Sequence, residues 1–445
     1  MCLHDHTSEA LPPAGLSRRG ILAGAAALAG ISVASVAAQL GSAPAAHAAE
    51  RPQAPNYPGR PTTPGAVVIE GGTIVDPLSG DAVADGVLVL DGGKVVAVGT
   101  RDATRKAVAA VAGRAQVLNA AGRWVVPGLV DVHVHAGALS DARLLLQGGV
   151  TSMRSGSSSF YQDVALAKLP TWAPGASPRM RPAGLFISPQ LGDSVLADPD
   201  LAPLATLKNG ITEASDLAYL TQVNLNRGAE VIKTRANPRA GLPEQDPREL
   251  VYNRDQLSAI VKAARGAGVL CHAYSADGID GAVRAGVRSI EHGVFLSEKT
   301  IAEMARRGTF FTPTLDGISS MATSSNPILA ARGREYTPIL KAAVRAAHEA
   351  GVTVVAGTDS FGSDVTPLGT EVRLLTEAGL SPLEALRSAT THAARLLGWE
   401  SKAGRFMPGA FADAVVVDAD PLSDGTALEK VRTVVAQGTV VRNGL

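Results

Sequence analysis

The stretch that decides the fold runs from Val125 to Gly137 and reads VVPGLVDVHVHAG. It is typical of a buried strand that ends in two histidines, His133 and His135. Side chains alternate along a strand, so the two imidazoles share one face while Val134 points to the other. Both imidazoles can therefore reach one metal ion, although an H-x-H pattern alone is a weak signal and depends on where the strand lies.

Similar apolar runs follow this strand and alternate with amphipathic helical segments, the pattern of βα units around a parallel sheet. Eight strand candidates are found: GLVDVHVH (128–135), GVTSMRS (149–155), RMRPAGLF (179–186), AEVIKTRA (229–236), GVLCHAYS (268–275), VRSIEHG (287–293), GTFFTPTL (308–315) and GVTVVAGTD (351–359). Eight units over about 250 residues predict an α/β fold, a closed (β/α)₈ TIM barrel. In such barrels the chemistry lies at the carboxyl ends of the strands.

Short β-rich runs flank the predicted barrel on both sides, for example GVLVLDGGKVVAVG before it and VRTVVAQGTVVRNG after it. One small β-sandwich domain formed from both termini explains this repetition. The predicted domains are a signal peptide (1–48), a Pro-rich leader (49–64), the β-sandwich (65–124 and 401–445) and the barrel (125–400).

The first fifty residues predict export. A twin-arginine start, Ser17 to Leu22, precedes an Ala/Gly-rich apolar stretch and an A-x-A cleavage site that ends at Ala48. A retained membrane anchor is the alternative. Cleavage removes Cys2 and leaves Cys271 as the only thiol, so the mature chain has no internal disulfide.

The composition indicates a soluble enzyme with a small-molecule substrate. The chain has 46% hydrophobic and 18% charged residues and a net charge of zero, without a long basic run. These values argue against nucleic acid or an anionic membrane as a partner of the mature protein. We also expect a homo-oligomer.

Three later strands end in residues of metal-ligand type: His272, His292 and Asp359. Together with the H-x-H pair they place four of the mature chain's six histidines at strand ends, which is hard to obtain by chance. The other two, His348 and His392, fall on helical patterns, where a solvated or packed histidine is the sounder interpretation.

Lys233 stands near the end of the fourth strand, where an ammonium would repel metal ions. Burial lowers the pKa of a lysine by as much as about 3 to 5 units, so a neutral amine becomes accessible. A neutral amine can add carbon dioxide and form a carbamate that bridges two metals. An ordinary ion pair with a nearby carboxylate is the alternative.

These motifs, in this order, resemble the amidohydrolase superfamily in its two-metal branch with a carboxylated lysine. KTRANPRAGLPEQDPRELV (233–251), the segment AGVRSIEHGVFLSEKTIAEMARRGTFFTPTL (285–315) and the THAARLLGW helix (391–399) are similar to the imidazolonepropionase-like and prolidase-like amidohydrolases, a group that includes ochratoxinase. The resemblance covers Val67 to Asn443 and is far more specific for fold and metals than for substrate.

The resemblance implies two divalent metal ions, with zinc as the default and manganese or cobalt able to take the same place. His133, His135 and Asp359 hold the more buried ion. His272 and His292 hold the more exposed one, and carboxylated Lys233 bridges both. The ions share a hydroxide that attacks an amide carbonyl, while Asp359 moves the proton to the leaving amine.

Strand alternation also sorts the neighbours of these ligands. Cys271, Glu291 and Thr358 each adjoin a ligand and are expected to face the helical layer. Arg235 and Tyr274 are expected to face the pocket, with Arg235 binding a substrate carboxylate; an internal ion pair and a packed tyrosine are the alternatives. Arg154 is a weaker substrate-binding candidate of the same kind.

The sequence departs from the family pattern in two loops. ISPQLGDS (187–194) stands where relatives carry TGGHG, and Arg154-Ser155 replaces an Arg-Asp pair. Both differences lie in loops that contact substrate and leave the metal centre untouched. Arg235 favours a substrate with a free carboxylate, so we expect hydrolysis of a C–N bond in a dipeptide or N-acyl amino acid. A cyclic amide, imide or lactone hydrolase is the runner-up, a single-metal deaminase would have no use for Lys233, and a catalytically silent secreted binding protein is the alternative outside enzymes.

Overall fold

The computed structural model describes residues 64–445. The predicted signal peptide (1–48) and all but the last residue of the predicted leader (49–64) lie outside the described residues, so export stays a prediction. Within 64–445, no helix combines the length and the apolar character that crossing a bilayer requires. The domain boundaries drawn from the sequence likewise stay predictions.

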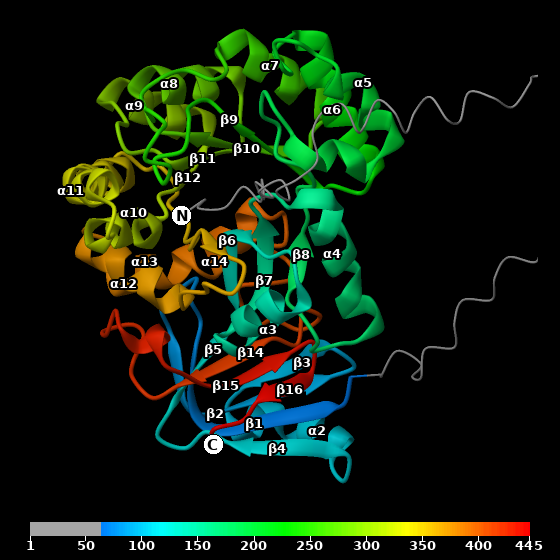
Figure 1. Ribbon diagram of the computed structural model, residues 1–445. Helices are drawn as coiled ribbons and strands as arrows, with labels where there is room; N and C mark the ends of the chain where they lie inside the picture. The colour runs from blue at the N-terminus through cyan, green and yellow to red at the C-terminus, as the bar shows by residue number, and fades with distance from the viewer. Residues whose placement is uncertain (1–63) are drawn as a thin grey trace, which may run out of the picture. The chain divides into compact units, whose positions relative to one another are not determined.

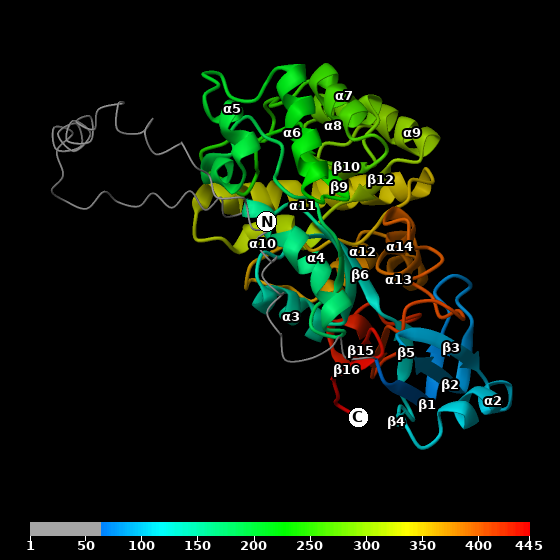
Figure 2. The same ribbon diagram turned by 90° about the vertical axis from the view of Figure 1, so that its right-hand side faces the viewer.

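The small β domain is one sheet built from two distant parts of the chain. Its strand order is β16-β15-β14-β5-β1-β2-β3, with β4 paired to β1. The strands are β1 (Ala66–Val75), β2 (Ala82–Asp91), β3 (Lys94–Gly99), β4 (Ala115–Asn119), β5 (Trp124–Pro127), β14 (Ala414–Val417), β15 (Val431–Ala436) and β16 (Thr439–Arg442). In both views the amino-terminal strands lie beside the carboxy-terminal ones (Figures 1 and 2).

Alternation along β1 explains how this domain buries both faces of the sheet. Ile69 packs in a core with Val416 and Val435 from the carboxy-terminal strands, whereas Val68 packs on the other face against helix α2 (Arg101–Val111). The two halves join where β5 pairs antiparallel with β14. A sandwich formed from both ends of the sequence is thus confirmed.

The barrel strands run parallel and form two four-stranded sheets. The first sheet holds β9 (Val231–Arg235), β10 (Gly268–Ala273), β11 (Ser289–His292) and β12 (Phe310–Thr312), and the second holds β6 (Leu129–His135), β7 (Val150–Ser155), β8 (Arg179–Arg181) and β13 (Ser360–Phe361). The eighth predicted strand (351–359) is irregular backbone, in which Val354 makes a single bridge to Phe311 before the chain enters β13. Backbone hydrogen bonds join the two sheets, from Ile187 N to Lys233 O (2.9 Å) and from Phe311 N to Thr353 O (3.0 Å). The eighth segment also reaches β6, because Val132 N donates to Ala356 O (3.1 Å). The predicted α/β class and (β/α)₈ barrel are confirmed.

The third barrel strand is shorter than the sequence predicts. The expected segment 179–186 is a regular strand only over Arg179–Arg181. Pro182 follows, which has no backbone N–H to continue the ladder. Its carbonyl accepts from the backbone N–H groups of Glu230 and Val231 (2.8 and 3.2 Å), so the chain keeps its place beside β9 as irregular backbone.

Helices form the outer layer of the barrel, and Figure 2 shows α7, α8 and α9 beside β9, β10 and β12. The longer ones are α3 (Leu139–Gln147), α4 (Gln162–Trp172), α6 (Ala214–Asn226), α7 (Arg254–Ala263), α8 (Ala276–Ala285), α9 (Glu298–Arg307), α11 (Pro327–Glu349) and α12 (Leu368–Glu377), and the shorter ones are α5 (Ala202–Ala205), α10 (Leu315–Ser320), α13 (Pro382–Ser388) and α14 (Thr391–Leu396). Their ends follow local chemistry. Ser297 caps α9 through the backbone N–H of Thr300, and Gly308 ends it with a left-handed φ of 68°.

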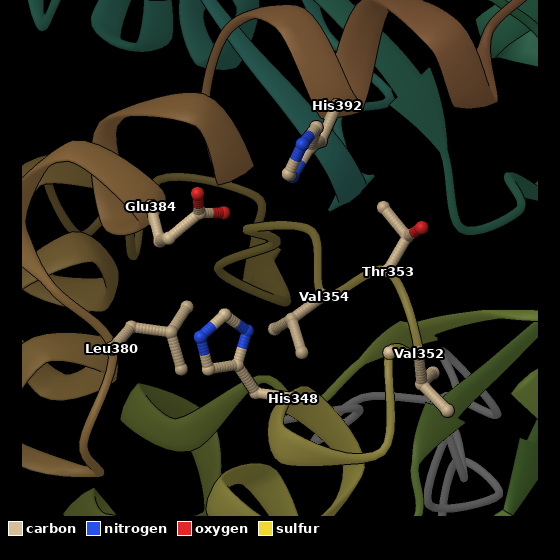
Figure 3. A pocket seen from close by; sticks show the side chains of 8 residues that line it. His348, Val352, Thr353, Val354, Leu380, Glu384 and His392 are labelled. Carbon is tan, nitrogen blue, oxygen red and sulfur yellow. The ribbon is translucent and has the colours of Figure 1, made fainter. Parts of the chain in front are cut away.

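A cavity of about 190 Å³ lies at the amino-terminal end of the eighth barrel segment (Figure 3). The side chains of His348, Glu384 and His392 line it together with Val352 and Val354. Burial lowers the pKa of His392 to about 4, so this imidazole is neutral near pH 7.

Candidate metal centre

The four strand-end histidines meet at the carboxyl ends of the barrel strands. The ring of His133 lies 5.5 Å from that of His135 and 5.4 Å from that of His292, centroid to centroid. The rings of His272 and His292 are 4.5 Å apart. All four side chains are buried. Strands β6, β10 and β11 thus bring together imidazoles that are far apart in the sequence.

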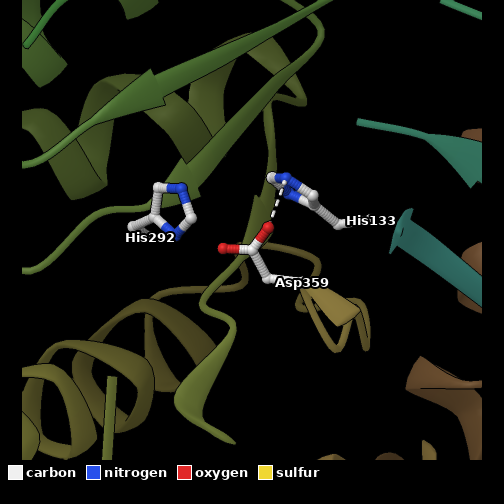
Figure 4. Close-up of side chains that lie close together, drawn as sticks. All are labelled: His133, His292 and Asp359. Carbon is white, nitrogen blue, oxygen red and sulfur yellow. Dashed lines mark ion pairs between the residues drawn. The ribbon is translucent and has the colours of Figure 1, made fainter. Parts of the chain in front are cut away.

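Asp359 and Lys233 complete this group. One carboxylate oxygen of Asp359, Oδ1, lies 3.3 Å from Nε2 of His133 and 3.3 Å from Nε2 of His135. Within residues 64–445, His133, His292 and Asp359 form one group whose potential ligand atoms all lie within 4.8 Å of one another (Figure 4). Lys233 is fully buried, with Nζ 3.0 Å from Nε2 of His133. The structure therefore brings all six predicted ligands together.

The outer nitrogens of three imidazoles have acceptors that orient the rings. Nδ1 of His133 donates to Glu291 Oε2 (2.7 Å), and Nδ1 of His135 lies 3.1 Å from the carbonyl oxygen of Ser157. Nδ1 of His292 lies 2.7 Å from the hydroxyl of Thr314. This leaves Nε2 of each ring for the centre, the arrangement that metal-binding histidines adopt. Imidazole nitrogens and a carboxylate oxygen suit zinc and related divalent ions, so these residues fit a metal centre.

Two ligand candidates stand on left-handed backbone. His292 has a φ of 72° and Asp359 a φ of 56°. Residues other than glycine rarely adopt this region, and such strain gathers at functional sites. The turn at the end of each strand breaks the alternation of side chains on which the sequence prediction relied.

Glu291 corrects that prediction. It was expected to face the helical layer, yet its carboxylate points into the barrel and contacts both His133 and Arg154 (2.8 Å). The left-handed backbone of His292 turns its imidazole inward as well, so neighbouring residues share one side. Burial alone would raise the pKa of Glu291, but the nearby Arg154 and His133 hold it far below its usual range.

Arg154 corrects a second prediction, since it was a candidate for binding substrate. Its guanidinium is buried and donates to the carbonyl of Val132 (2.6 Å), the hydroxyl of Ser289 (2.9 Å) and Glu291. Arg154 therefore forms an internal ion pair next to the ligands.

Asp131 ties the first strand to the end of the eighth. Its carboxylate accepts from the backbone N–H of His133 (3.0 Å) and of Thr358 (3.2 Å), and from the Thr358 hydroxyl (2.8 Å). Burial raises the pKa of Asp131 to about 6. This clamp fixes the backbone on either side of His133 and Asp359.

Arg235 and Tyr274 lie next to the predicted ligands, and their roles in substrate binding stay predictions. The Tyr274 ring stacks on His292 with centroids 5.0 Å apart and planes 5° from parallel. The guanidinium of Arg235 lies 4.4 Å from the ring centroid of Phe186, and that of Arg239 lies 5.6 Å from the same centroid. Phe186 and Arg239 were both missed by the sequence analysis. Phe186 ends the segment expected as the third strand, which is irregular after Arg181, and Arg239 stands in a loop, where no periodicity assigns a direction.

Cys271 is fully buried in the apolar core shared by the barrel and its helices. Burial raises the pKa of its thiol to about 12, so it carries no thiolate near neutral pH.

The chain is similar to a known protein family and to several known proteins. Residues 124–441 match the model of the amidohydrolase family. A protein of Mycobacterium tuberculosis without assigned function is 28% identical over 335 residues, which cover 71% of this chain and 85% of that protein. Ochratoxinase of Aspergillus niger is 28% identical over 224 residues, which cover 48% of this chain and 46% of ochratoxinase.

The solved structures agree with the family match. A prolidase crystallised with N-methylphosphonate-L-proline is 27% identical, with a TM-score of 0.70 over 85% of this chain and all of the prolidase chain. The family match spans well over half of the chain. Members of this family generally use a metal centre, and this barrel gathers His133, His292 and Asp359 in one group of potential ligands. The chain belongs to the amidohydrolase family and is a metal-dependent hydrolase that acts on carbon–nitrogen bonds.

Proposed function

We propose that this protein is an exported two-metal hydrolase that cleaves the amide bond of a dipeptide or N-acyl amino acid with a free carboxylate. The observation that carries this proposal is the position of Arg235. Its guanidinium packs on Phe186, whose ring stands edge-on to the predicted ligand His272 at 6.5 Å. An arginine at this place can bind a carboxylate with two parallel hydrogen bonds.

The charges around the site favour an anionic substrate. Arg239 places a second guanidinium against the same ring. Of the buried carboxylates nearby, Glu291 is committed to Arg154 and His133, and Asp131 to Thr358 and His133. The two arginines therefore place positive charge beside the predicted ligands. The prolidase relative, crystallised with an N-substituted proline, is consistent with a substrate that carries a carboxylate.

His133, His135 and Asp359 would hold one ion, His272 and His292 the other, and carboxylated Lys233 would lie between them. Two divalent ions in these places would supply Lewis acidity, which lowers the pKa of water and polarises the scissile carbonyl. Full burial of Lys233 supports carboxylation, because an ammonium in that position would lack water and stand beside cations.

Asp359 is the proposed proton carrier. Its Oδ1 faces the imidazoles of His133 and His135, so the carboxylate is held at the centre of the site. It would accept a proton from the attacking water and deliver it to the nitrogen of the leaving amine. Tyr274, packed flat on His292, would orient the substrate carbonyl.

The test compares substrate acids with their neutral analogues. Protein loaded with zinc or manganese is assayed against dipeptides and N-acyl amino acids and against the same compounds with an amidated carboxylate. We expect kcat/KM to be about 10- to 100-fold higher for the acids, which is the value of a charged hydrogen-bonded pair. A chelator should abolish turnover.

The variant Arg235→Gln should remove most of this preference through a higher KM. Arg248→Gln is the matched control, since Arg248 pairs with Glu335 at the surface. Equal turnover of acids and amides, or hydrolysis confined to cyclic imides or lactones, would contradict the proposal.

Export is a separate part of the proposal and rests on the residues Arg18 and Arg19. The mature protein should begin at Ala49 when its amino terminus is determined by mass spectrometry of the exported fraction. Changing both arginines to lysine should leave the protein uncut and inside the cell. Unchanged export of that variant would contradict export by the twin-arginine route.

A further inference from the structure

A buried polar network lies directly behind His133. The carboxylate of Glu291 accepts from Nδ1 of His133 with one oxygen and from Arg154 with the other, and it also accepts from the hydroxyl of Ser289. Arg154 and Glu291 are at most 2% exposed, and Ser289 is fully buried. The network is therefore shielded from bulk solvent.

Arg154 links the network to the backbone of the same strand that carries His133. Its Nε donates to the carbonyl of Val132, the residue before His133, while Nη1 and Nη2 reach Ser289 and Glu291. One guanidinium thus fixes both the main chain of β6 and the carboxylate that accepts the hydrogen bond from the imidazole of His133. A buried ion pair is costly unless its hydrogen bonds are satisfied, and here each charged group has several partners.

The outer nitrogen of His133 meets the charged carboxylate of Glu291. The corresponding partner of His135 is the carbonyl of Ser157, and that of His292 is the hydroxyl of Thr314, both uncharged. A carboxylate partner fixes the tautomer of an imidazole and raises the basicity of its other nitrogen more than a neutral acceptor does. Among these three imidazoles, Nε2 of His133 should therefore be the strongest metal ligand.

We propose that Glu291, held in place by Arg154 and Ser289, is a positioning residue that orients His133 and sets the affinity of the centre for its more buried ion. The inference rests on the metal centre of the proposed function but not on the substrate. It assigns the buried Arg154–Glu291 pair a role in selective metal retention.

The test measures metal affinity in the variant Glu291→Gln, which keeps the shape of the side chain and removes its charge. Zinc and cobalt affinities are determined on the full chain by competition with a chromogenic chelator. We expect the wild type to hold two ions, and one of the two to bind about 10- to 100-fold more weakly in the variant. The visible spectrum of the cobalt-loaded protein should change with it, because the field around one ion changes.

Asp163→Asn is the matched control. Asp163 is also a fully buried carboxylate, but it accepts from the backbone N–H groups of Val164, Ala183 and Gly184 and contacts none of the predicted ligands. Its variant should lose stability in the metal-free form without a change in metal affinity or in the cobalt spectrum.

A second variant covers the case in which Glu291→Gln does not fold. Ser289→Ala removes one hydrogen bond to Glu291 and should weaken the same ion by a smaller factor, about three- to tenfold. Unchanged affinity and cobalt spectrum in a folded Glu291→Gln variant, or in Ser289→Ala when only that variant folds, would overturn the inference. Loss of affinity in a protein that hydrolyses no amide would instead sustain it and refute the proposed substrate class.

Discussion

The barrel carries histidines at both ends of its eighth segment, and the two groups behave differently. At the carboxyl end, His133 and His292 gather around Asp359 with ligand atoms within 4.8 Å. At the amino end, His348 and His392 line a cavity with Glu384 (Figure 3). Both groups combine imidazoles and a carboxylate, yet within residues 64–445 it is the first that reaches the spacing of a metal site.

The difference lies in what holds each side chain. At the carboxyl end, carbonyl, hydroxyl and carboxylate partners orient three of the rings toward a common point. At the amino end, Glu384 is taken by Arg387, and Arg395 binds the hydroxyl of Thr353 instead of a carboxylate. Residue type alone therefore does not make a metal site; convergent strand ends and orienting partners do.

The largest expected effect tests the carboxylates of the two groups. Asp359→Asn should lower kcat by about 10³-fold, because it removes the proposed proton carrier. For Glu384→Gln, at the other end of the barrel, kcat should stay within about twofold of the wild-type value, because this carboxylate lies far from the predicted ligands and partly exposed changes of this kind usually have small effects. Steady-state kinetics on the best substrate of the panel measure both variants. If Asp359→Asn keeps a tenth of the wild-type activity, Asp359 is not the proton carrier.

The second effect compares one histidine from each group. Zinc at a hundredfold excess over its Kd should raise the unfolding free energy of the metal-free protein by about 2.7 kcal/mol. His133→Asn should lose most of this gain, and His392→Asn should keep it. Denaturant titration with and without zinc measures the gain in each variant. If zinc stabilises both variants equally, the two groups of histidines do not differ in metal binding.

The third effect uses pH. The pKa of His392 falls from 6.5 to about 4 because the folded chain buries it. Between these values the unfolded chain binds more protons than the folded one, so stability rises with pH and is lost as pH falls from about 6.5 toward 4. This histidine should contribute roughly 2 kcal/mol to the loss after allowance for partial exposure. The pH profile of His392→Gln should be flatter by that amount, and an identical profile would mean that the imidazole stays solvated.

The smallest effect concerns a thiol that stands one residue from a ligand. Cys271 precedes His272 on β10 but lies in the apolar core, with its thiol pKa raised to about 12 by burial. Cys271→Ala should cost about 1 kcal/mol of stability, the value of one buried group, and leave the metal content unchanged. A thiol reagent should not label the native protein; rapid labelling or lost metal would place Cys271 in the site.

Much of the fold could be predicted because the barrel repeats one pattern. Apolar runs that contain His135 and His272 mark strands whose ends meet, the run that ends in Asp359 leads into β13, and the order of these motifs resembles a known family. Pro182 itself is a signal that the third strand ends early, because proline has no backbone N–H for the ladder. The place of the irregular segment beside β9 could not be predicted, because it depends on hydrogen bonds from Glu230 and Val231, which are distant in the sequence.

The site could be predicted less completely because contacts across the barrel leave no local trace. Arg154 and Glu291 are 137 residues apart, and nothing near either residue indicates the other. The direction of Glu291 was wrong because alternation assumes extended backbone, whereas His292 has a left-handed φ. The six predicted ligands lie together because the ends of the segments that carry them converge, and their binding of metal stays a prediction.

The pairing of β5 with β14 has a consequence for biosynthesis. Arg123, next to this seam, binds Asp418 across 295 residues of sequence. A ribosome must therefore translate the entire barrel before β14 can cover the edge of β5, and until then this edge can template pairing with another nascent chain. Copies stalled before residue 414 should swap strands or aggregate, whereas completed copies close the seam themselves.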